Sequence, residues 1–277
     1  MSNRIDLHTH SDCSDGLLSP PELVALAARR DLRMLALTDH DTVDGCAAAG
    51  AACAAAAIRF VPGVELSCQW REREIHVVGL RVDPGHAELL AHCSVVNGRR
   101  RERLQSMARR LARAGLPGDP LLALAATARS PTRTHLAREL CRLGVCDHPQ
   151  QAFDRWLKRG QPGYVAAQWP PLAAAVHCIV AAGGIAVLAH PHRYPLSHGA
   201  LRELVADFKA AGGEGIEVSL AGMGPKDADR AASLARRLEL AGSIGSDFHE
   251  PDLPWRPLGR FDKLPDQITP IAARLEP

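Results

Sequence analysis

Seven separated segments of this chain place histidine, aspartate or glutamate where an apolar run ends. They are Asp6–His10, Ser14–Gly16, Thr38–Asp41, Gly63–Glu65, Ile75–Val77, Ala189–Pro191 and Ser246–His249. Most of these segments lie at or near the end of an expected strand, and parallel α/β barrels collect their catalytic groups at the carboxyl ends of their strands. Imidazole and carboxylate groups are ligands of divalent metal ions. The pattern therefore predicts a barrel with a multinuclear metal site and hydrolytic activity.

Length and charge narrow the class of protein further. The chain has 277 residues, a formal net charge of +2 and 46% hydrophobic residues. This length suits one large α/β domain or a domain with an insertion, and the balanced charge argues against a nucleic-acid coat or a membrane surface. The eight cysteines form no Cys-x-x-Cys pair, no apolar stretch is long enough to span a membrane, and the start does not resemble a secretory leader. We therefore expect a cytoplasmic protein with reduced thiols.

Strands alternate with helices over most of the chain. We expect strands at 4–8, 33–38, 59–67, 72–81, 184–189, 215–220 and 243–247, and helices at 19–30, 42–58, 171–182, 201–211 and 226–240. Such alternation favours parallel pairing of the strands.

The middle of the chain has a different pattern. From about residue 99 to residue 164 the sequence is helical without a convincing strand, and Gly-Pro clusters interrupt it. We interpret this block as an inserted helical cap subdomain. The expected domains are then a first barrel part at 1–98, the insert at 99–164 and a second barrel part at 165–277.

Two of the polar segments carry a spacing that suits metal binding. His8 and His10 are two residues apart, so on a strand both imidazoles lie on one face; Asp247 and His249 repeat the spacing. A single histidine on an apolar strand is more often a structural residue, and only the joint pattern argues for a metal site. Five histidines lack this context, and we expect them to be surface or structural residues: His86, His92, His148, His177 and His198.

Taken in order, the motifs resemble those of the PHP (polymerase and histidinol phosphatase) family, a branch of the amidohydrolase-like metalloenzymes. The resemblance covers everything except the middle block and the tail. It implies an α/β fold, a distorted (β/α)7 barrel with two or three divalent ions at the carboxyl ends of its strands, here with an inserted helical cap subdomain.

The resemblance also implies three groups of ligands. The first ion is held by His8, His10, Glu65 and Asp247, the second by Glu65 as a bridge with His76 and His190, and the third by Asp15, His40 and His249. Nitrogen and oxygen ligands without thiolate suit Mn²⁺, Fe²⁺ or Zn²⁺. The resemblance favours Mn²⁺.

Three further residues flank the expected ligands. Asp39 and Asp41 are positioned to orient His40, or alternatively to cap the helix that begins near Thr42. His192 follows the Ala-His-Pro motif and is a candidate donor to a substrate phosphate.

The insert supplies candidates for binding an anionic substrate. Its first helix has an apolar stripe and a separate arginine face, which is either solvated or, at Arg99, in contact with substrate. The segment 130–135 opens another helix, where Arg133 and His135 are candidate phosphate ligands. It resembles an Arg-x-His segment in PHP phosphoesterases that act on nucleotides.

Within the family, the motifs most resemble the subgroup that removes the 3'-phosphate of nucleoside 3',5'-bisphosphates and trims short 5'-phosphorylated RNAs. We expect this reaction, with a metal-bridged hydroxide as nucleophile, and nucleotides or short RNA ends as partners, without a membrane or a stable nucleic-acid complex. The alternatives are a histidinol-phosphate or other small phosphoester phosphatase, a non-catalytic PHP accessory module, and a free-standing metal-binding or nucleic-acid-binding protein.

Overall fold

The computed structural model describes residues 4–251 and 256–275. The chain divides into two compact units, one formed by Met1–Cys93 with Pro170–Pro277 and the other by Ser94–Trp169. Residues 1–3, 252–255 and 276–277, which belong to the expected barrel segments, lie outside the described residues. Among the described residues, no helix combines the length and the apolar character that crossing a membrane requires.

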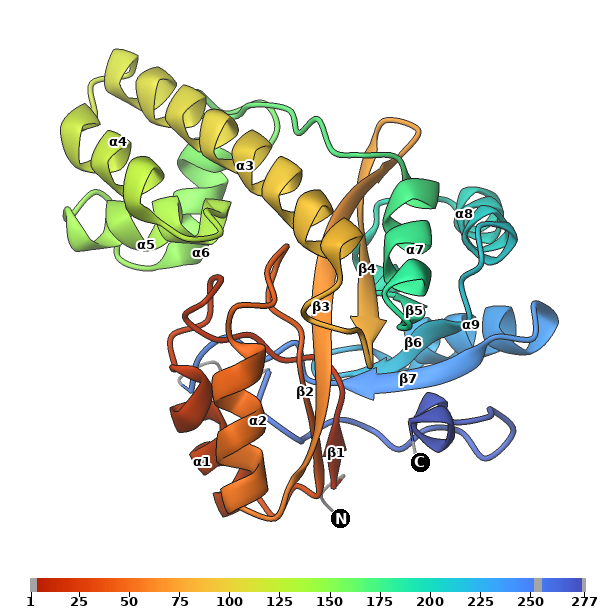
Figure 1. Ribbon diagram of the computed structural model, residues 1–277. Coiled ribbons are helices and arrows are strands. Elements are labelled where there is room, and N and C mark those ends of the chain that lie inside the picture. Colours follow the sequence, from red (N-terminus) through yellow and green to blue (C-terminus); the bar gives the residue numbers. More distant parts are fainter. Residues whose placement is uncertain (1–3, 252–255, 276–277) are drawn as a thin grey trace. The chain divides into compact units, whose positions relative to one another are not determined.

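The first unit is a seven-stranded barrel whose strands follow one another in sequence order (Figure 1). The strands are β1 (Ile5–Asp6), β2 (Met34–Leu37), β3 (Arg59–Trp70), β4 (Arg73–Leu80), β5 (Ile185–Leu188), β6 (Gly215–Leu220) and β7 (Ala241–Gly245). Backbone hydrogen bonds join the two edges of the sheet: Leu7 N, just after β1, donates to Ile244 O of β7 at 3.2 Å, and Asp247 N, just after β7, donates to His8 O at 2.9 Å. The expected barrel is confirmed.

Strand β4 departs from the expected parallel pairing, which is wrong at this place. It runs antiparallel to both β3 and β5, whereas the other neighbouring strands are parallel. The reason is local: Arg71 and Glu72 form a turn between β3 and β4, and a parallel pair would need a crossover of a dozen or more residues. Arg71 has a positive φ of 53° in this turn. The reversed strand places His76 opposite Ser67, two residues from Glu65.

Helices pack on the outside of the barrel. They are α1 (Pro20–Arg29), α2 (Cys46–Ala55), α7 (Leu172–Ala181), α8 (His198–Ala210) and α9 (Pro225–Arg237). Helices α1 and α2 contact each other and strands β2 and β3, whereas α7 contacts β3 to β5 and α9 contacts β6 and β7 (Figure 1). Helix α2 begins four residues later than expected, after a turn in which Cys46 N donates to Val43 O at 3.0 Å.

Three apolar clusters hold this unit together, and one of them lies between α1, α2 and β2. Inside the barrel, the β-strand side chains of Val78 and Val187 pack with Leu7 and Ile271. A second cluster fills the space between the sheet and helices α7 to α9, with Phe208 among its fully buried members. Each fully buried side chain of this size contributes about 1.5–3 kcal/mol relative to an exposed one. The outer cluster fixes the helices against the strands, and the site at the strand ends is held by this packing.

Asp6, at the end of β1, fastens the closure of the barrel. Its carboxylate is fully buried and accepts hydrogen bonds from the backbone N–H groups of Ser246 at 2.9 Å, Gly259 at 2.9 Å and His8 at 3.3 Å. Burial raises the pKa of Asp6 to about 6, although these hydrogen bonds lower it. The residue therefore ties β1 to the segment after β7.

Replacing Asp6 by alanine is expected to lower the free energy of unfolding by about 2 kcal/mol, because buried N–H donors lose their acceptor. Urea unfolding in the presence of EDTA measures the change without a contribution from bound metal. Asp229→Ala, which removes an exposed carboxylate from α9, is the control and should leave the midpoint nearly unchanged. Equal midpoints for the two variants would contradict the role of Asp6.

The second unit is helical. It contains the carboxyl-terminal part of α3 (Ala87–Arg113), α4 (Gly118–Thr127), α5 (Arg133–Arg142), α6 (Pro149–Ala152) and a π-helical turn at Phe153–Leu157. The expected apolar stripe of the first helix forms its core, where Leu104, Met107, Ala108 and Leu111 are buried against α4 and α5 side chains such as Leu121 and Leu136. The boundary between the units falls inside α3, which starts earlier than the sequence indicates.

Candidate metal centre

The nine predicted ligands all lie in the barrel unit: Glu65 and His76 lie within β3 and β4, and the others lie in the segments that follow β1, β2, β5 and β7. His8 and His10 follow β1, His40 follows β2 and forms an isolated parallel bridge with Glu65 of β3, and His190 follows β5. Asp247 and His249 follow β7. The barrel thus brings together segments that are separated by more than two hundred residues in the chain, as the pairing of Thr9 with Phe248 illustrates.

Three overlapping groups of these side chains could each hold a metal ion. Within each group the ligand atoms lie within 4.8 Å of one another. The groups are His8, His10, Glu65 and Asp247; His10, Asp15, His40 and His249; and His40, Glu65 and His76. The first group has the same members as the expected first site, and the second adds His10 to the expected third site. No cysteine belongs to any of the groups.

Glu65 lies at the centre of the cluster. Its Oε1 atom is 2.9 Å from His76 Nδ1 and 2.8 Å from His190 Nε2. Its Oε2 atom is 2.9 Å from His40 Nδ1 and 3.4 Å from His8 Nε2. One carboxylate therefore reaches imidazoles from four different segments, which is the arrangement a bridging ligand requires.

The surroundings of the Glu65 Oε2 atom indicate whether a cation fits here. This atom is buried, and none of its contacts with described residues has the geometry of a hydrogen bond. Burial alone raises the pKa of Glu65, but the surrounding imidazoles, first of all His40 and His76, hold it well below its usual value. A buried, ionised oxygen without a hydrogen bond is costly unless a cation satisfies it. The residues present therefore fit divalent metal ions.

The imidazoles of His10 and His190 are in the state that binds a metal. Burial lowers the pKa of His10 to about 3 and the pKa of His190 to about 4. Both rings are therefore neutral near neutral pH and offer a lone pair. The Nε2 atoms of His8 and His10 lie 3.1 Å apart, so both rings point at one place. A single ion can accept both nitrogens there.

Asp15 adds a further carboxylate to the cluster, next to His249. Burial alone raises the pKa of Asp15, but His249 and then His40 hold it well below its usual value. His249 Nε2 lies 3.2 Å from Asp15 Oδ1, and His249 Nδ1 donates to the backbone oxygen of Asp247 at 2.9 Å. The hydrogen bond to Asp247 orients the ring of His249, so that its other nitrogen faces Asp15.

Backbone conformation at the strand ends is unusual. His190 has a φ of 28° and Asp247 a φ of 51°, and Asp41 has a φ of 50°. Non-glycine residues rarely adopt the left-handed region, and such residues concentrate at functional sites, where the surrounding structure offsets a strain of about 1–3 kcal/mol. The left-handed backbone turns the side chains of His190 and Asp247, two candidate ligands, into the cluster just after β5 and β7.

Glu217 contacts the candidate site, although the sequence did not indicate it. It lies on β6, is almost fully buried, and its Oε1 atom accepts a hydrogen bond from His8 Nδ1 at 2.7 Å. Its Oε2 atom accepts from the backbone N–H of His190. The first contact fixes His8 with its Nε2 lone pair toward the cluster. The only signal in the sequence was an acidic residue inside the apolar strand Gly-Ile-Glu-Val-Ser-Leu.

Two arginines were missed as well. Arg193 and Arg256 both donate to Asp247 Oδ2, Arg256 at a distance of 3.1 Å. Burial alone raises the pKa of Asp247, but Arg193 and then His249 hold it well below its usual value. Arg193 lies three residues after His190, and the sequence analysis named His192 as a candidate but not Arg193. Both guanidinium groups therefore hold Asp247 ionised and leave its Oδ1 atom 3.1 Å from His10 Nε2.

The structure gives Asp39 and Asp41 contacts with neighbouring loops. Asp39 accepts hydrogen bonds from the hydroxyls of Ser11 and Ser14, each at 2.6 Å, and from Ser11 N at 2.7 Å. Asp41 accepts from Ser67 N at 2.8 Å. Asp39 thereby anchors the loop that carries Asp15.

His192 lies on the short 3-10 helix Pro191–Arg193 and is half-buried. Burial, followed by the charge of Arg193, lowers the pKa of His192. Its Nδ1 atom has no hydrogen-bond partner among the described residues. A nitrogen in this situation is available to a ligand.

The candidates in the second unit have defined local contacts. The arginine face of α3 binds backbone carbonyls of the segment 164–168: Arg99 donates to Gln168 O at 2.8 Å, Arg103 to Val165 O at 3.0 Å, and Arg110 to Tyr164 O. These three arginines of the face therefore bind backbone carbonyls of their own unit, which neither of the two expected alternatives included.

Arg133 and His135 lie in the first turn of α5. His135 Nδ1 accepts a hydrogen bond from Thr132 N at 3.1 Å, and the two residues form a capping box at the start of α5. This contact fixes the ring and uses one of its two nitrogens.

An α/β barrel with clustered imidazole and carboxylate ligands at its strand ends defines a metal-dependent hydrolase of the amidohydrolase-like class. The sequence pattern of the PHP domain matches residues 6–143. Relatives that are similar over nearly the whole chain extend this match. The chain belongs to the PHP domain family.

Two relatives and one solved structure are similar over nearly the whole chain. A 3',5'-nucleoside bisphosphate phosphatase from Chromobacterium violaceum is 42% identical, covering 98% of this chain and 96% of the relative. A 5'-3' exoribonuclease from Haemophilus influenzae is 39% identical, covering 98% of each chain. The structure of an amidohydrolase from C. violaceum with bound sulfate has a TM-score of 0.93 and 40% identity, covering 98% of this chain and 95% of that one.

Proposed function

We propose that this protein hydrolyses the 3'-phosphate of nucleoside 3',5'-bisphosphates, giving a nucleoside 5'-phosphate and phosphate, and that it also trims short 5'-phosphorylated RNAs. The observation that carries the proposal is the cluster around Glu65, together with the similarity of the whole chain to a 3',5'-nucleoside bisphosphate phosphatase and a 5'-3' exoribonuclease.

The chain's own residues divide the work of phosphate ester hydrolysis. Divalent ions, when bound, lower the pKa of a water molecule and offset the charge of the phosphoryl oxygens. Neutral His10 and His190 and ionised Glu65 would hold these ions, and Glu217 would orient His8. His192 would donate a hydrogen bond to a phosphoryl oxygen, because its Nδ1 atom is buried without a partner among the described residues.

We assign Mn²⁺ as the native metal, with two or three ions bound. Its support is a set of nitrogen and oxygen ligands that contains no thiolate. Zn²⁺ or Fe²⁺ would suit the same ligands, so the assignment is tested by measuring metal content after purification and activity after loading with each ion. We also place the protein in the cytoplasm, a proposal supported by its eight free cysteines.

The test of the reaction is phosphate release from adenosine 3',5'-bisphosphate by the purified protein with Mn²⁺, with the nucleotide product identified. Release of phosphate with 5'-AMP as product supports the proposal. Histidinol phosphate is the comparison substrate, and faster hydrolysis of it would overturn the proposal in favour of the rival phosphatase. The Asp15→Asn and His249→Ala variants serve as background controls, because each removes a proposed ligand.

Arg133→Ala is expected to raise KM roughly tenfold for substrates that carry a 5'-phosphate, because a guanidinium-phosphate contact contributes about 1.4 kcal/mol or more. We compare adenosine 3',5'-bisphosphate with adenosine 3'-phosphate, which lacks the 5' group. The KM for adenosine 3'-phosphate should stay unchanged. Arg142→Ala, which removes an exposed arginine from the far end of α5, is the control. Equal effects on both substrates would contradict recognition of the 5'-phosphate by Arg133.

A further inference from the structure

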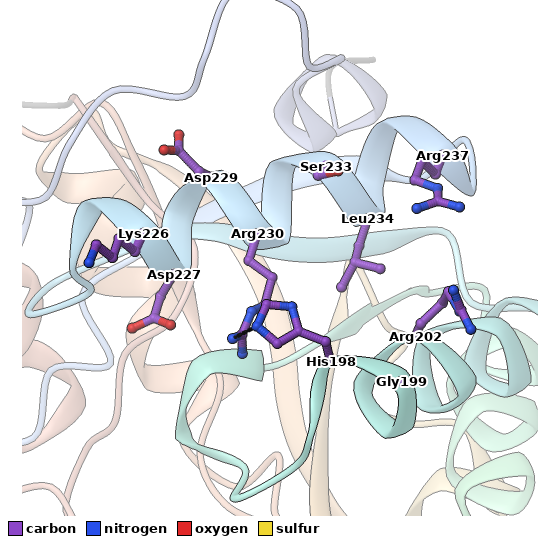
Figure 2. A pocket seen from close by; sticks show the side chains of 10 residues that line it. All are labelled: His198, Gly199, Arg202, Lys226, Asp227, Asp229, Arg230, Ser233, Leu234 and Arg237. Carbon is purple, nitrogen blue, oxygen red and sulfur yellow. Dashed lines mark hydrogen bonds between the residues drawn. The ribbon is translucent and has the colours of Figure 1, made fainter.

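A groove rich in positive charge lies between helices α8 and α9, outside the metal centre. Its volume is about 540 Å³. Four cationic side chains line it, two from the middle and end of α9, one from its start and one from α8: Arg230, Arg237, Lys226 and Arg202. Figure 2 shows Arg202 and Arg237 at one end of the groove and Arg230 beside His198.

The charges in this groove have no acidic partners among the residues that the structure describes. No ion pair is found there for Arg202, Lys226, Arg230 or Arg237, although exposed arginines elsewhere, such as Arg71 with Glu203, form one. Of the two acidic residues that line the groove, Asp229 points away from α8 in Figure 2. Positive charge therefore exceeds negative charge along the groove, which favours a polyanion.

His198 holds one of the arginines in place. Its Nε2 atom accepts a hydrogen bond from Arg230 Nη2, which joins the start of α8 to the middle of α9. The ring thereby aims a guanidinium into the groove without neutralising its charge. The sequence had offered only a surface or structural role for this histidine.

One end of the groove lies toward the side of the barrel that carries the candidate ligands. Helix α8 follows β5 and α9 follows β6, so both helices begin at the edge of the barrel where the ligands gather. Helix α9 also contacts the segment Pro191–Arg193, directly after the ligand His190. From Lys226 to Arg237 the groove follows α9 for roughly 16 Å, at 1.5 Å per residue. This length exceeds a single phosphate group and suits a chain of phosphates that leaves the site.

We propose that this groove binds the phosphodiester backbone of a single-stranded RNA substrate, on the 3' side of the nucleotide held at the metal centre. This inference rests on the proposed function, because it assumes that the protein acts on short RNAs. Exposed arginines and the partial positive charge at the start of two helices recognise phosphates without reading the bases. The contacts are few and solvated, so they favour a substrate that is bound briefly and released.

The experiment measures binding of a short 5'-phosphorylated oligoribonucleotide in EDTA, by fluorescence anisotropy at several salt concentrations. The test variant is Arg230→Gln with Arg237→Gln. The matched control is Arg29→Gln with Arg236→Gln, which removes the same charge from exposed positions outside the groove. We expect the test variant to bind roughly tenfold more weakly at low salt. The slope of log K against log salt should fall by roughly 1.4, about 0.7 for each phosphate that the variant no longer neutralises.

Hydrolysis of adenosine 3',5'-bisphosphate, measured with Mn²⁺ on the same proteins, separates this inference from the proposed function. Its kcat/KM should be unchanged in both double variants, because this substrate is too short to enter the groove. Equal reductions of oligonucleotide binding in the test and control variants would overturn the groove assignment. So would a wild-type protein that hydrolyses the bisphosphate and does not bind the oligonucleotide. A third result separates the two proposals. If only the groove variant loses oligonucleotide binding, and the wild-type protein hydrolyses neither the bisphosphate nor the oligonucleotide, the groove binds RNA but the proposed function is wrong.

Discussion

Replacing Glu65 by glutamine is expected to lower kcat/KM for adenosine 3',5'-bisphosphate by roughly a thousandfold, or about 4 kcal/mol of transition-state stabilisation. The carboxylate contacts imidazoles from four segments and keeps two ionised oxygens in a buried place. Glutamine has a similar size but carries no charge, and its amide nitrogen cannot bind a cation. Bound metal should fall together with activity.

The measurement combines steady-state kinetics with metal content after dialysis, and circular dichroism shows whether the fold is kept. Glu203→Gln is the control, since it removes a carboxylate that is 53% exposed and forms an ion pair with Arg71 at the surface. This control should keep wild-type kinetics. Near wild-type activity in the Glu65→Gln variant, with metal retained, would falsify the bridging role.

Glu217→Gln is expected to raise the Mn²⁺ concentration needed for half-maximal activity by roughly 10–100-fold, the usual effect of changing a group that orients a metal ligand. Glu217 is not one of the proposed metal ligands. Instead it accepts a hydrogen bond from His8 Nδ1 at 2.7 Å and so keeps the Nε2 lone pair of His8 toward the cluster. Saturating metal should therefore restore most of kcat, which distinguishes this variant from Glu65→Gln.

Titration of activity with Mn²⁺ from a metal-free preparation measures this effect. Glu214→Gln is a matched control just before β6, because Glu214 is exposed and pairs with Arg274 at 2.6 Å. The control should have the wild-type activation constant. Two results contradict the positioning role: an unchanged activation constant in Glu217→Gln, or a loss of kcat that no concentration of metal restores.

The ligand cluster was readable from the chain because its members occur in recurrent local motifs. His8 with His10 and Asp247 with His249 share a two-residue spacing, and their segments end apolar runs. The structure brings the first expected group together without a change of members, although His10 also belongs to a second group with Asp15. Strands place alternate residues on one face, so a short-range spacing carries over directly into three dimensions.

Residues that act through long-range contacts were not readable in this way. Glu217 and His8 are 209 positions apart, and nothing in the sequence around either residue indicates the other. The arginine face of α3 is a second example, with partners closer in the chain. The helical spacing of these arginines was evident in the sequence, but their hydrogen bonds were not. Nothing indicated that Arg99 and Arg103 would donate to carbonyls of the segment 164–168.

The sequence by itself determined the class of barrel, the side chains that gather in the candidate metal centre and the helical nature of the middle of the chain, because strand and helix periods and residue spacing are local properties. Only the tertiary structure decided the reversed direction of β4, the closure of the barrel through Asp6, the support of His8 by Glu217 and the groove between α8 and α9. These features depend on which segments meet in space, and pairing between distant segments is set by packing of the whole chain rather than by any one stretch of it.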